Sequence, residues 1–398
     1  MTRASHSYHD GDTQALPLAT GAAEQASGRM SYASSGNGSN QGMWGSKQDH
    51  QKSPRKSRER RRASRRHTSH SFLSFLLWIA SAFIIAVMVI RILPANIADS
   101  GFMPLIVSFV PWLGIASALI LILALVWRRK VLALVSVACI LVQIFWHIGY
   151  IKPTTTISQA AKTAVTSATV NTSDKYARIM TFNTHTGTAD VNEIVQTVKD
   201  QHVEVLALQE MTQGFIQRLE AAGISKVLPY SVIASTKHGD NGGVNGLWTA
   251  AAQSNVNSNL IPTDASSIPA ASITLGTTTV RFGSVHPNSP TRGQQSVWSA
   301  GLDTISSLKN YDHTYVLMGD FNSTWDHPSF RSLLGSKFVD SSEQAGEGFH
   351  MTYPANSKIP PLIEIDHIVH TSGVSVGDLE TVQIADSDHR ALLATIEA

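Results

Sequence analysis

The chain has 398 residues, with 31 Lys and Arg against 29 Asp and Glu, so its formal net charge is only +2. That charge is unevenly distributed: residues 1–71 carry 12 basic and 5 acidic residues (12 − 5 = +7), residues 72–150 carry 4 and 1 (+3), and residues 151–398 carry 15 and 23 (−8). The asymmetry argues against one uniform soluble domain and against a basic nucleic-acid-binding domain at the C-terminus. The single cysteine, Cys139, excludes an intrachain disulfide and a cysteine-based zinc site, and no disulfide-linked partner is evident.

The N-terminal segment is polar and then strongly basic. Residues 1–50 are rich in Ser, Gly, Ala, Gln and Asn, a composition that buries too little apolar surface to offset the entropy of ordering. A block of Lys and Arg follows at 52–66. This block could bind nucleic acid or anionic lipid, but its place just before an apolar run favours a signal for membrane orientation. We therefore predict a disordered, basic, cytoplasmic tail over residues 1–71.

Three apolar runs follow the tail. They cover residues 72–93, 103–127 and 131–148, which is 22, 25 and 18 residues, and the first contains a single late charge, Arg91. A helix needs about 20 predominantly apolar residues to cross a bilayer. The sequence therefore predicts three transmembrane helices within residues 72–150, with Pro111 able to kink the second.

The charges that flank these runs predict an orientation. Basic segments favour the cytoplasmic side, which applies to the tail and to the turn Arg128-Arg129-Lys130, whereas the loop 94–102 has no Lys or Arg and is expected outside. Three crossings then place everything after about residue 150 outside the cytoplasm. We expect a multi-pass protein of the cell membrane, in contact with its lipid bilayer, and failure of one span to insert would reverse the side of the C-terminal part.

Residues 151–175 are rich in Thr, Ser and Ala without apolar periodicity and are predicted to be a flexible linker. From residue 176 to 398 the pattern is that of one compact domain with mixed strands and helices. Strands are expected at 177–182, 203–208, 230–234, 280–285, 315–318, 363–369 and 391–396, and helices at 191–198, 212–222, 292–308 and 330–334. The stretches 239–246 and 265–272 are expected to be loops.

Polar residues gather at the ends of these expected strands. They are Asn183 and His185, Gln209 and Glu210, His286, Asp320 and Asn322, Asp366 and His367, and Asp388 and His389. Carboxylates and amide oxygens suit a hard cation such as Mg²⁺, and histidines suit proton transfer near neutral pH. Each has an ordinary structural explanation when taken alone, because Asp-x-Asn is a common turn signature and a Glu at a strand end is often a solvated rim residue. The ordered set is the informative feature.

The ordered set resembles the endonuclease/exonuclease/phosphatase superfamily of DNase I-like proteins. The matching motifs are Thr181-Phe182-Asn183, Leu208-Gln209-Glu210, Ser284-Val285-His286, Gly319-Asp320-Phe321-Asn322, Ile365-Asp366-His367-Ile368 and Ser387-Asp388-His389-Arg390. They run in the family's order and cover residues 176–398, whereas the tail and the apolar runs lie outside the resemblance. The chain is identified as a membrane-anchored, bacterial-type member, which implies an α+β fold with a two-sheet β-sandwich flanked by helices and the site at one edge of the sheets.

The resemblance also implies a metal site. Glu210 would bind a divalent cation, Mg²⁺ or Mn²⁺, with Asn183 and Asp388 nearby as further ligands or as groups that orient a ligand. A metal and other electrophilic groups stabilise the negative charge that develops on phosphate oxygens and on the leaving alkoxide during phosphoester hydrolysis.

Roles for five further residues follow from the same resemblance. Asp320 would position or deprotonate the attacking water, and Asn322 would contact the scissile phosphate. His389, oriented by Asp366, would bind a phosphoryl oxygen or transfer a proton. His286 matches the position of a leaving-group acid or phosphate donor in nuclease-type members.

Substrate binding is less clearly indicated. Many nuclease and sphingomyelinase members carry a Ser-Arg pair in a middle strand, and the corresponding stretch 246–255 has no Arg. Arg292 could reach an anionic substrate, although simple helix initiation after Thr291 also explains it. Tyr353 lies in a Thr-Tyr-Pro element similar to one near the family's site, and it could also serve only in packing.

We expect an outward-facing, metal-dependent phosphoric-ester hydrolase of nuclease or phosphodiesterase type, acting on nucleic acid, a nucleotide or a lipid head group. One alternative is phospholipase C-like, sphingomyelinase-like or phosphatase activity on a small or lipid phosphoester, which the net charge of −8 over residues 151–398 (15 − 23) mildly favours because long nucleic acids need several cationic contacts. A second alternative is a non-catalytic envelope protein for binding or sensing, which the intact set of site residues disfavours.

Overall fold

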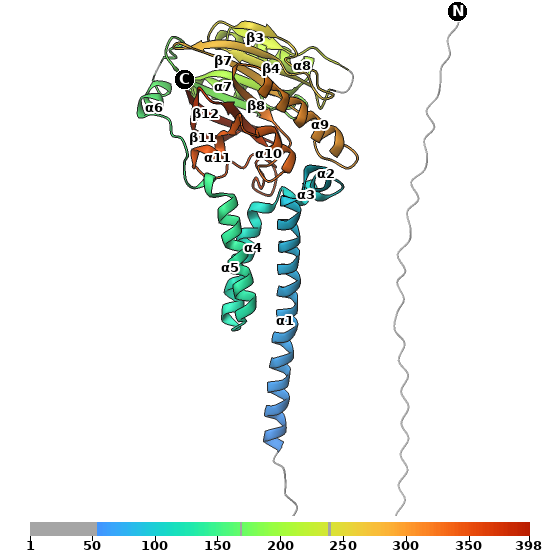
Figure 1. Cartoon of the computed structure of the whole chain (residues 1–398). Coiled ribbons are helices and arrows are strands. Elements are labelled where there is room, and N and C mark those ends of the chain that lie inside the picture. Colours follow the sequence, from blue (N-terminus) through green and yellow to red (C-terminus); the bar gives the residue numbers. More distant parts are fainter. Residues whose placement is uncertain (1–53, 168, 238–239) are drawn as a thin grey trace, which may run out of the picture. The chain divides into compact units, whose positions relative to one another are not determined.

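The computed structural model describes residues 54–167, 169–237 and 240–398 (Figure 1). Residues 1–53, which hold most of the predicted disordered tail, lie outside the described residues. The chain divides into two units, Met1–Arg60 and Arg61–Ala398, and the second contains both the apolar helices and the sheets.

The apolar part of the chain forms helices of unequal length. Helix α1 (Pro54–Ile92) begins within the segment predicted to be disordered, and its part Ser71–Ile92 is the one helix among the described residues that is long and apolar enough to cross a membrane. Helices α4 (Val110–Val126) and α5 (Lys130–Trp146) have 17 residues each. At 1.5 Å per residue, each spans about 26 Å, short of the roughly 30 Å hydrocarbon core. Only one of the three predicted spans therefore meets the length required, which corrects the prediction of three.

The second predicted span is shortened by its prolines. Pro111 lies in the first turn of α4, and Pro104 lies in the first turn of the separate short helix α3 (Met103–Val107). Proline lacks an amide N–H and has a fixed φ, so it begins a helix more readily than it continues one. The loop before α3 holds helix α2 (Ala95–Ala98). The segment between α1 and α4 is therefore a compact connection of two short helices, and we refer to residues 95–109 as the α2–α3 segment.

The predicted linker contains a docked helix. Helix α6 (Gln159–Val165) starts at Ser158, whose hydroxyl accepts a hydrogen bond from Ala161 N at 3.1 Å. The backbone N–H of Ser158 donates to Glu397 at 2.8 Å, and Ala161 and Val165 are buried. Side-chain burial fixes this helix where composition alone indicated a flexible chain.

The strands form two six-stranded mixed sheets. The first has the order β11-β12-β1-β2-β4-β3, and the second has the order β5-β6-β7-β8-β10-β9. The first sheet contains β1 (Tyr176–Asn183), β2 (Val203–Met211), β3 (Tyr230–Ile233), β4 (Val244–Thr249), β11 (Ser375–Gln383) and β12 (Arg390–Glu397). The second contains β5 (Ser254–Asn257), β6 (Ala270–Leu275), β7 (Thr278–Val285), β8 (Thr314–Asp320), β9 (Phe338–Asp340) and β10 (Asp366–Thr371). Each sheet has one parallel pair, β1 with β2 and β7 with β8.

Apolar clusters fill the layers between and outside the sheets. Alternate residues of β1, β2, β7 and β8 meet in the central core, such as Ile179 and Phe282. Helices α7 (Val191–Asp200) and α8 (Gln213–Ala222) cover the outer face of the first sheet. Helices α9 (Gln295–Ser306) and α10 (Pro328–Leu334) cover the outer face of the second, around Trp298. This confirms the predicted α+β sandwich flanked by helices, with the short helix α11 (Ser341–Ala345) against β11.

Two stretches predicted as loops run into strands. The stretch 239–246 continues into β4, and 265–272 continues into β6. Strand β4 contains Asn245 and Gly246, residue types that are unfavourable in strands. Asn245 is nevertheless buried and donates to Ser267 O at 3.0 Å. A hydrogen bond from the neighbouring loop therefore compensates for a polar residue that obscures the strand in the sequence.

The topology brings the predicted motifs to one edge of the sandwich. Strands β1 and β2 end at Asn183 and Met211, and the parallel pair in the other sheet ends at Val285 and Asp320. The antiparallel neighbours β10 and β12 begin at the same edge, where Asp366 pairs with Asp320 in register. Parallel strands expose their carboxyl ends together, and that is where an open sheet presents side chains to a ligand.

Candidate active site

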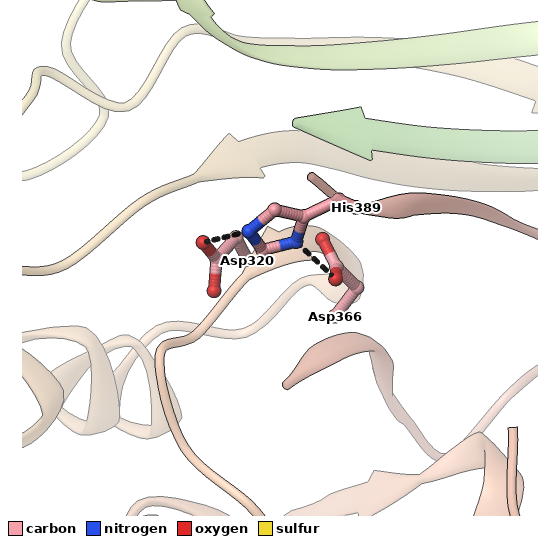
Figure 2. A group of neighbouring side chains, drawn as sticks. All are labelled: Asp320, Asp366 and His389. Carbon is pink, nitrogen blue, oxygen red and sulfur yellow. Dashed lines mark hydrogen bonds and ion pairs between the residues drawn. The ribbon is translucent and has the colours of Figure 1, made fainter. Parts of the chain in front are cut away.

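The centre of this edge is a histidine between two carboxylates. Figure 2 shows His389 with one ring nitrogen toward Asp366 and the other toward Asp320. His389 Nδ1 lies 2.7 Å from Asp366 Oδ2, and His389 Nε2 lies 3.7 Å from Asp320 Oδ2. All three side chains are buried. The hydrogen bond to Asp366 fixes the plane of the imidazole ring and leaves Nε2 free to face the reacting groups.

The charges of this group stabilise one another. Burial disfavours a charged His389, but attraction to Asp366 and Asp320 outweighs it and raises the pKa of His389 to about 10. Burial likewise disfavours a charged Asp320, but the charge of His389 and the hydrogen bonds to Asp320 lower its pKa to about 2. At neutral pH the site therefore holds an imidazolium next to an ionised Asp320.

Glu210 is directed into the site by a strand irregularity. The pairing of β2 with β4 shifts register between Leu208 and Met211, and Glu210 has φ +57°, in the left-handed region. A bulge of this kind turns a side chain away from its regular place on the pleat, and strained backbone is concentrated at functional sites. Asn183 Nδ2 bridges Glu210 Oε1 and Asp320 Oδ2, both at 3.0 Å. Asn183 therefore orients two carboxylates through its amide nitrogen.

Two glycines make room for Glu210. Gly242 has φ +72°, and a Cβ atom there would lie 2.5 Å from Glu210 Cδ and Oε2. At Gly243 a Cβ atom would lie 2.6 Å from Met211 O. The glycine pair lets the loop before β4 pass closely over the carboxylate, which explains the Gly-Gly sequence there.

His286 and Asn322 form the second-sheet side of the site. His286 Nε2 lies 3.5 Å from Asp320 Oδ2 and 3.2 Å from Asn322 Nδ2. Burial lowers the pKa of His286, but the interactions with Asp320 and Glu210 outweigh it, so the pKa is raised. The backbone N–H of Asn322 donates to Asp320 Oδ1 at 2.7 Å, in the Asx-turn geometry that its Asp-x-Asn sequence favours.

A cavity of about 480 Å³ opens in front of these groups. Glu210, Asp320, Asn322, Asp388 and His389 line it, and so do the predicted substrate-binding residues Arg292 and Tyr353. The remaining predicted residues, Asn183, His286 and Asp366, bond to the lining residues from behind. The structure thus brings every predicted site residue to one place, and the ring of Tyr353 lies 5.1 Å from the ring of His389.

Sequence reasoning missed several cavity residues. Asn241 lines the cavity, and its Nδ2 lies 3.0 Å from His286 Nε2. In the sequence it is one of several Asn and Gly residues of a loop, without a distinguishing signal. Phe102 and Leu105 also line the cavity, although they belong to the α2–α3 segment and lie far from every motif in the sequence. Only the folded chain shows that this segment contributes to the site.

The donor set fits a hard divalent cation. Among the described residues, Asp320, Asp366 and His389 form a group with ligand atoms within 4.8 Å of one another, close enough to hold a metal ion. Both ring nitrogens of His389 already face carboxylates, so its own positive charge occupies the position that an ion would take there. Glu210 and Asp388 instead present carboxylates to the cavity, and among the described residues each is paired with a histidine and with no other cation. Carboxylate oxygens are the ligands that Mg²⁺ and Mn²⁺ prefer.

Comparison with known proteins agrees with this geometry. A sequence model of the Endonuclease/Exonuclease/phosphatase family matches residues 180–389, more than half of the chain. No curated protein matches the chain.

Several solved structures are similar to part of the chain. TDP2 from D. rerio, in a complex with a single-strand DNA product, has 15% identity, a TM-score of 0.47 and covers 56% of this chain and 100% of its own. An endonuclease/exonuclease/phosphatase family protein from Leptotrichia buccalis has 16% identity, a TM-score of 0.46 and the same coverage. Sphingomyelinase C from Streptomyces griseocarneus has 16% identity, a TM-score of 0.41 and covers 55% and 99%. The family assignment rests on the matched family model.

Proposed function

The chain belongs to the endonuclease/exonuclease/phosphatase family, and on that premise we propose that it is a membrane-anchored, divalent-metal-dependent hydrolase of phosphodiesters. The observation that carries this proposal is the pairing of His389 with Asp366 and Asp320 at the floor of a cavity that Glu210 and Asp388 also line. A positively charged hydrogen-bond donor, an ionised carboxylate and further carboxylates all lie at this cavity. That is the set of groups that phosphoryl transfer to water requires.

The proposed metal would be held by Glu210 and Asp388, with Asn183 orienting Glu210. When bound, the ion polarises the phosphoryl oxygens and neutralises charge that develops in the transition state. This role accounts for acidic residues in a cavity that receives an anionic phosphate, because without a cation they would repel it.

The side chains supply the remaining chemistry. Asp320, kept ionised by its low pKa, orients a water molecule and accepts its proton as the water oxygen bonds to phosphorus. His389 Nε2 donates to a phosphoryl oxygen, and Asn322 contacts the same phosphate from the neighbouring turn. As the ester P–O bond breaks, the leaving oxygen takes a proton from water in the open cavity, which leaves a phosphomonoester and an alcohol. His286 does not line the cavity and instead holds Asp320 and Asn322 in place.

Surface composition supports membrane anchoring. Large apolar side chains point outward along α1, α4 and α5, where a soluble bundle would present polar ones. Several small or polar side chains are buried beside an apolar cluster that includes Ile84, Val110 and Leu132. The outward set includes Phe75, Ile79, Phe83, Leu119, Leu134 and Phe145, and the buried small or polar set includes Ser81, Ser117, Ser136 and Gln143. Contiguous apolar surface on this scale suits lipid contact, and small residues suit close packing of membrane helices.

The helix pairing supports an outward-facing catalytic domain. Helices α4 and α5 pack together and are joined by a turn at Trp127–Arg129. Whether this hairpin crosses the bilayer twice or enters and returns, the chain ends on the side where it began. The Arg and Lys residues of the tail favour the cytoplasm for the start of α1. The single crossing by α1 therefore determines the side of the membrane on which the catalytic domain lies. The proposed outward placement of the catalytic domain therefore does not require α4 and α5 to cross the whole bilayer.

The activity test uses the full chain in lipid nanodiscs. We expect hydrolysis of at least one substrate among bis(p-nitrophenyl) phosphate, plasmid DNA and sphingomyelin in the presence of Mg²⁺, and loss of that hydrolysis in EDTA. Asp320→Asn should lower turnover by about 10²-fold or more, whereas Asp312→Asn, an exposed aspartate just before β8, should not. Absence of EDTA-sensitive hydrolysis on all three substrates would favour the non-catalytic alternative.

The orientation has its own test. Alkaline phosphatase fused to the C-terminus folds only outside the cytoplasm, so an outward catalytic domain predicts an active fusion. An inactive fusion at normal expression, with an active β-galactosidase fusion at the same site, would place the domain inside the cell.

A further inference from the structure

The apolar wall of the cavity comes from the connection between the first two apolar helices. Phe102 and Leu105, in the α2–α3 segment, line the same cavity as Glu210 and His389. Their side chains are 65% and 61% exposed, so they are not part of a packed core. Ile363 and Tyr353 face the cavity from the catalytic domain. One cavity thus combines a polar, ionised end with an apolar flank that contains two largely exposed hydrophobic side chains.

The α2–α3 segment is firmly attached to the catalytic domain. His327 Nε2 lies 2.9 Å from Pro104 O, and Gln295 Nε2 donates to Gly101 O at 2.7 Å. In the following helix, Trp112 Nε1 donates to Leu362 O at 2.7 Å, one residue before Ile363. These bonds hold the backbone of the segment on both sides of Phe102 and Leu105. The two side chains are therefore displayed on a fixed support, as a preformed binding surface requires.

The position of the segment in the chain is also informative. It lies between the end of α1 at Ile92 and the start of α4 at Val110, which are the ends of two apolar helices. If α1 crosses a bilayer, this connection lies at the bilayer surface, next to the polar head groups. Exposed apolar side chains at that level lie beside the hydrocarbon chains of lipids.

We infer that the substrate is an amphiphilic phosphodiester of the adjoining membrane leaflet, whose hydrocarbon chain lies on Phe102 and Leu105 while its phosphate meets the catalytic groups. This inference rests on the proposed function and names its substrate class. The polar end of such a molecule would reach Asn322 and His389, and its charge would be met by Arg292 and the proposed cation. The apolar chain covers surface that water would otherwise contact, which contributes to binding in proportion to the area covered.

The same lining disfavours a long nucleic acid. Arg292 is the one Arg or Lys among the described residues that line the cavity, which also include Glu210, Asp320 and Asp388. Binding of a polynucleotide draws its affinity from several Lys and Arg contacts to successive phosphates. Phe102 and Leu105, on the apolar flank of the cavity, carry no charge that could pair with a phosphate.

A homologous series of substrates isolates the apolar contribution. The p-nitrophenyl monoalkyl phosphates with methyl, butyl and octyl chains share the scissile bond and leaving group and differ only in chain length. With the full chain in nanodiscs and each ester below its micelle concentration, we expect kcat/KM to rise on the order of 10-fold or more from methyl to octyl. The double substitution Phe102→Ser with Leu105→Ser should remove most of that rise, so that the ratio of kcat/KM for the octyl ester to kcat/KM for the methyl ester falls toward one.

A matched control sits on the same segment. Ile97→Ser replaces a side chain of α2 that is 45% exposed and does not line the cavity, so the rise with chain length should persist. An equal loss on methyl and octyl esters would show that Phe102 and Leu105 support the site's structure, and an unchanged rise would show that they do not touch the chain; either result overturns the inference. Faster, substitution-independent cleavage of an oligothymidylate would overturn it in favour of nucleic acid.

Failure of the proposed function is distinguishable from failure of this inference. If no ester is hydrolysed with Mg²⁺ present, equilibrium binding of methyl and octyl phosphonate, measured by calorimetry, takes the place of kcat/KM. Tighter binding of the octyl compound that is lost with Phe102→Ser and Leu105→Ser supports an amphiphile site without catalysis. Equal binding of both compounds contradicts the inference whatever the enzymatic result.

Discussion

Two aspartates lie near the end of β8: Asp320 is the last residue of the strand, and Asp326 lies in the loop that follows. Both pair with a histidine, yet the two pairs have opposite surroundings. Asp320 lies near His389 and lines the cavity. Asp326 lies 3.1 Å from His147 and pairs with Arg91, and neither partner belongs to the sandwich. Burial disfavours ionisation of Asp326, but the hydrogen bond and charge of His147 and the charge of Arg91 outweigh it, so its pKa is lowered. Both carboxylates are therefore buried, paired and ionised.

The two aspartates differ in whether a ligand can reach them. Asp320 has a cavity in front of it, so its charge is available to a ligand, whereas Asp326 is enclosed between the catalytic domain and the ends of α1 and α5. Arg331 adds a bond from the domain to the same place by donating to Arg91 O at 2.7 Å. The Asp326 group also accounts for Arg91, the one charge of the first apolar run. A buried pair in a fold indicates function only when it is open to a ligand; when enclosed, it joins structural parts.

The largest expected effect tests the open pair. His389→Ala should lower kcat, measured below the Tm of the variant, by about 10²-fold or more, because it removes the cation that faces Asp320 and the phosphate. Its Tm should fall as well, because buried Asp366 loses its histidine. Turnover and thermal unfolding of the full chain in nanodiscs measure both. Near-normal kcat in this variant would show that His389 has no role in the mechanism. The open pair would then differ from the Asp326 pair in access but not in function.

Substitution in the enclosed pair should lower stability and leave turnover nearly unchanged. Asp326→Asn leaves Arg91 and His147 buried without a carboxylate, and loss of one partner of a buried pair costs about 3–5 kcal/mol, or roughly 6–20 °C in Tm. The kcat measured below the lowered Tm should stay within about threefold, because Asp326 does not line the cavity. Asp312→Asn, an exposed aspartate of the preceding loop, is the control for loss of one negative charge. A large loss of kcat with unchanged Tm would show that Asp326 is coupled to the chemistry.

Sequence patterns predicted the sandwich and the open pair because both depend on local order. Short apolar runs marked the central strands, where every second residue must be buried, and each motif stands where such a strand ends. Asp320 and His389 are 69 residues apart (389 − 320), but parallel and antiparallel pairing bring those strand ends to one edge. The resemblance to a family predicted the roles of the site residues, and the sheet topology explains why these residues lie at one edge of the sandwich.

The enclosed pair and the apolar wall escaped prediction for a physical reason. Arg91, Phe102 and His147 acquire their partners only when separate parts of the chain dock, and no period or motif records such contacts. The number of spans was overestimated because hydropathy counts apolar residues and takes no account of where Pro111 starts a helix. Asn245 obscured β4 for a similar reason, since its hydrogen bond to Ser267 lies outside the strand.

A smaller effect tests how Glu210 is held on the open side. Gly242→Ala places a Cβ atom against the Glu210 carboxylate, so the flexible side chain must move. We expect the Mg²⁺ concentration for half-maximal activity to rise about tenfold, as when a group that orients a metal ligand is lost. Gly348→Ala, at φ +95° with no heavy atom within 4 Å of the added Cβ, carries the same backbone strain without the contact and should leave the Mg²⁺ requirement unchanged. An equal change in both variants would assign the effect to backbone strain.

The last prediction concerns stability and not turnover, through a third buried carboxylate, Glu204 on β2. No cationic side chain of the described residues pairs with it. Burial, aided by the charge of Asp174, raises its pKa to about 8 from an ordinary value of 4.5. Between these pH values the unfolded chain has released the proton and the folded chain retains it, so the free energy of unfolding falls as pH rises through this window, and levels off above it. Glu204→Gln has no proton to release, so its Tm should rise relative to that of the unsubstituted chain steadily from pH 5 to pH 8, whereas exposed Glu220→Gln should show no such trend. A Tm difference independent of pH would mean that Glu204 is already ionised in the fold, and that an unpaired carboxylate, unlike Asp320 and Asp326, keeps its charge without a histidine.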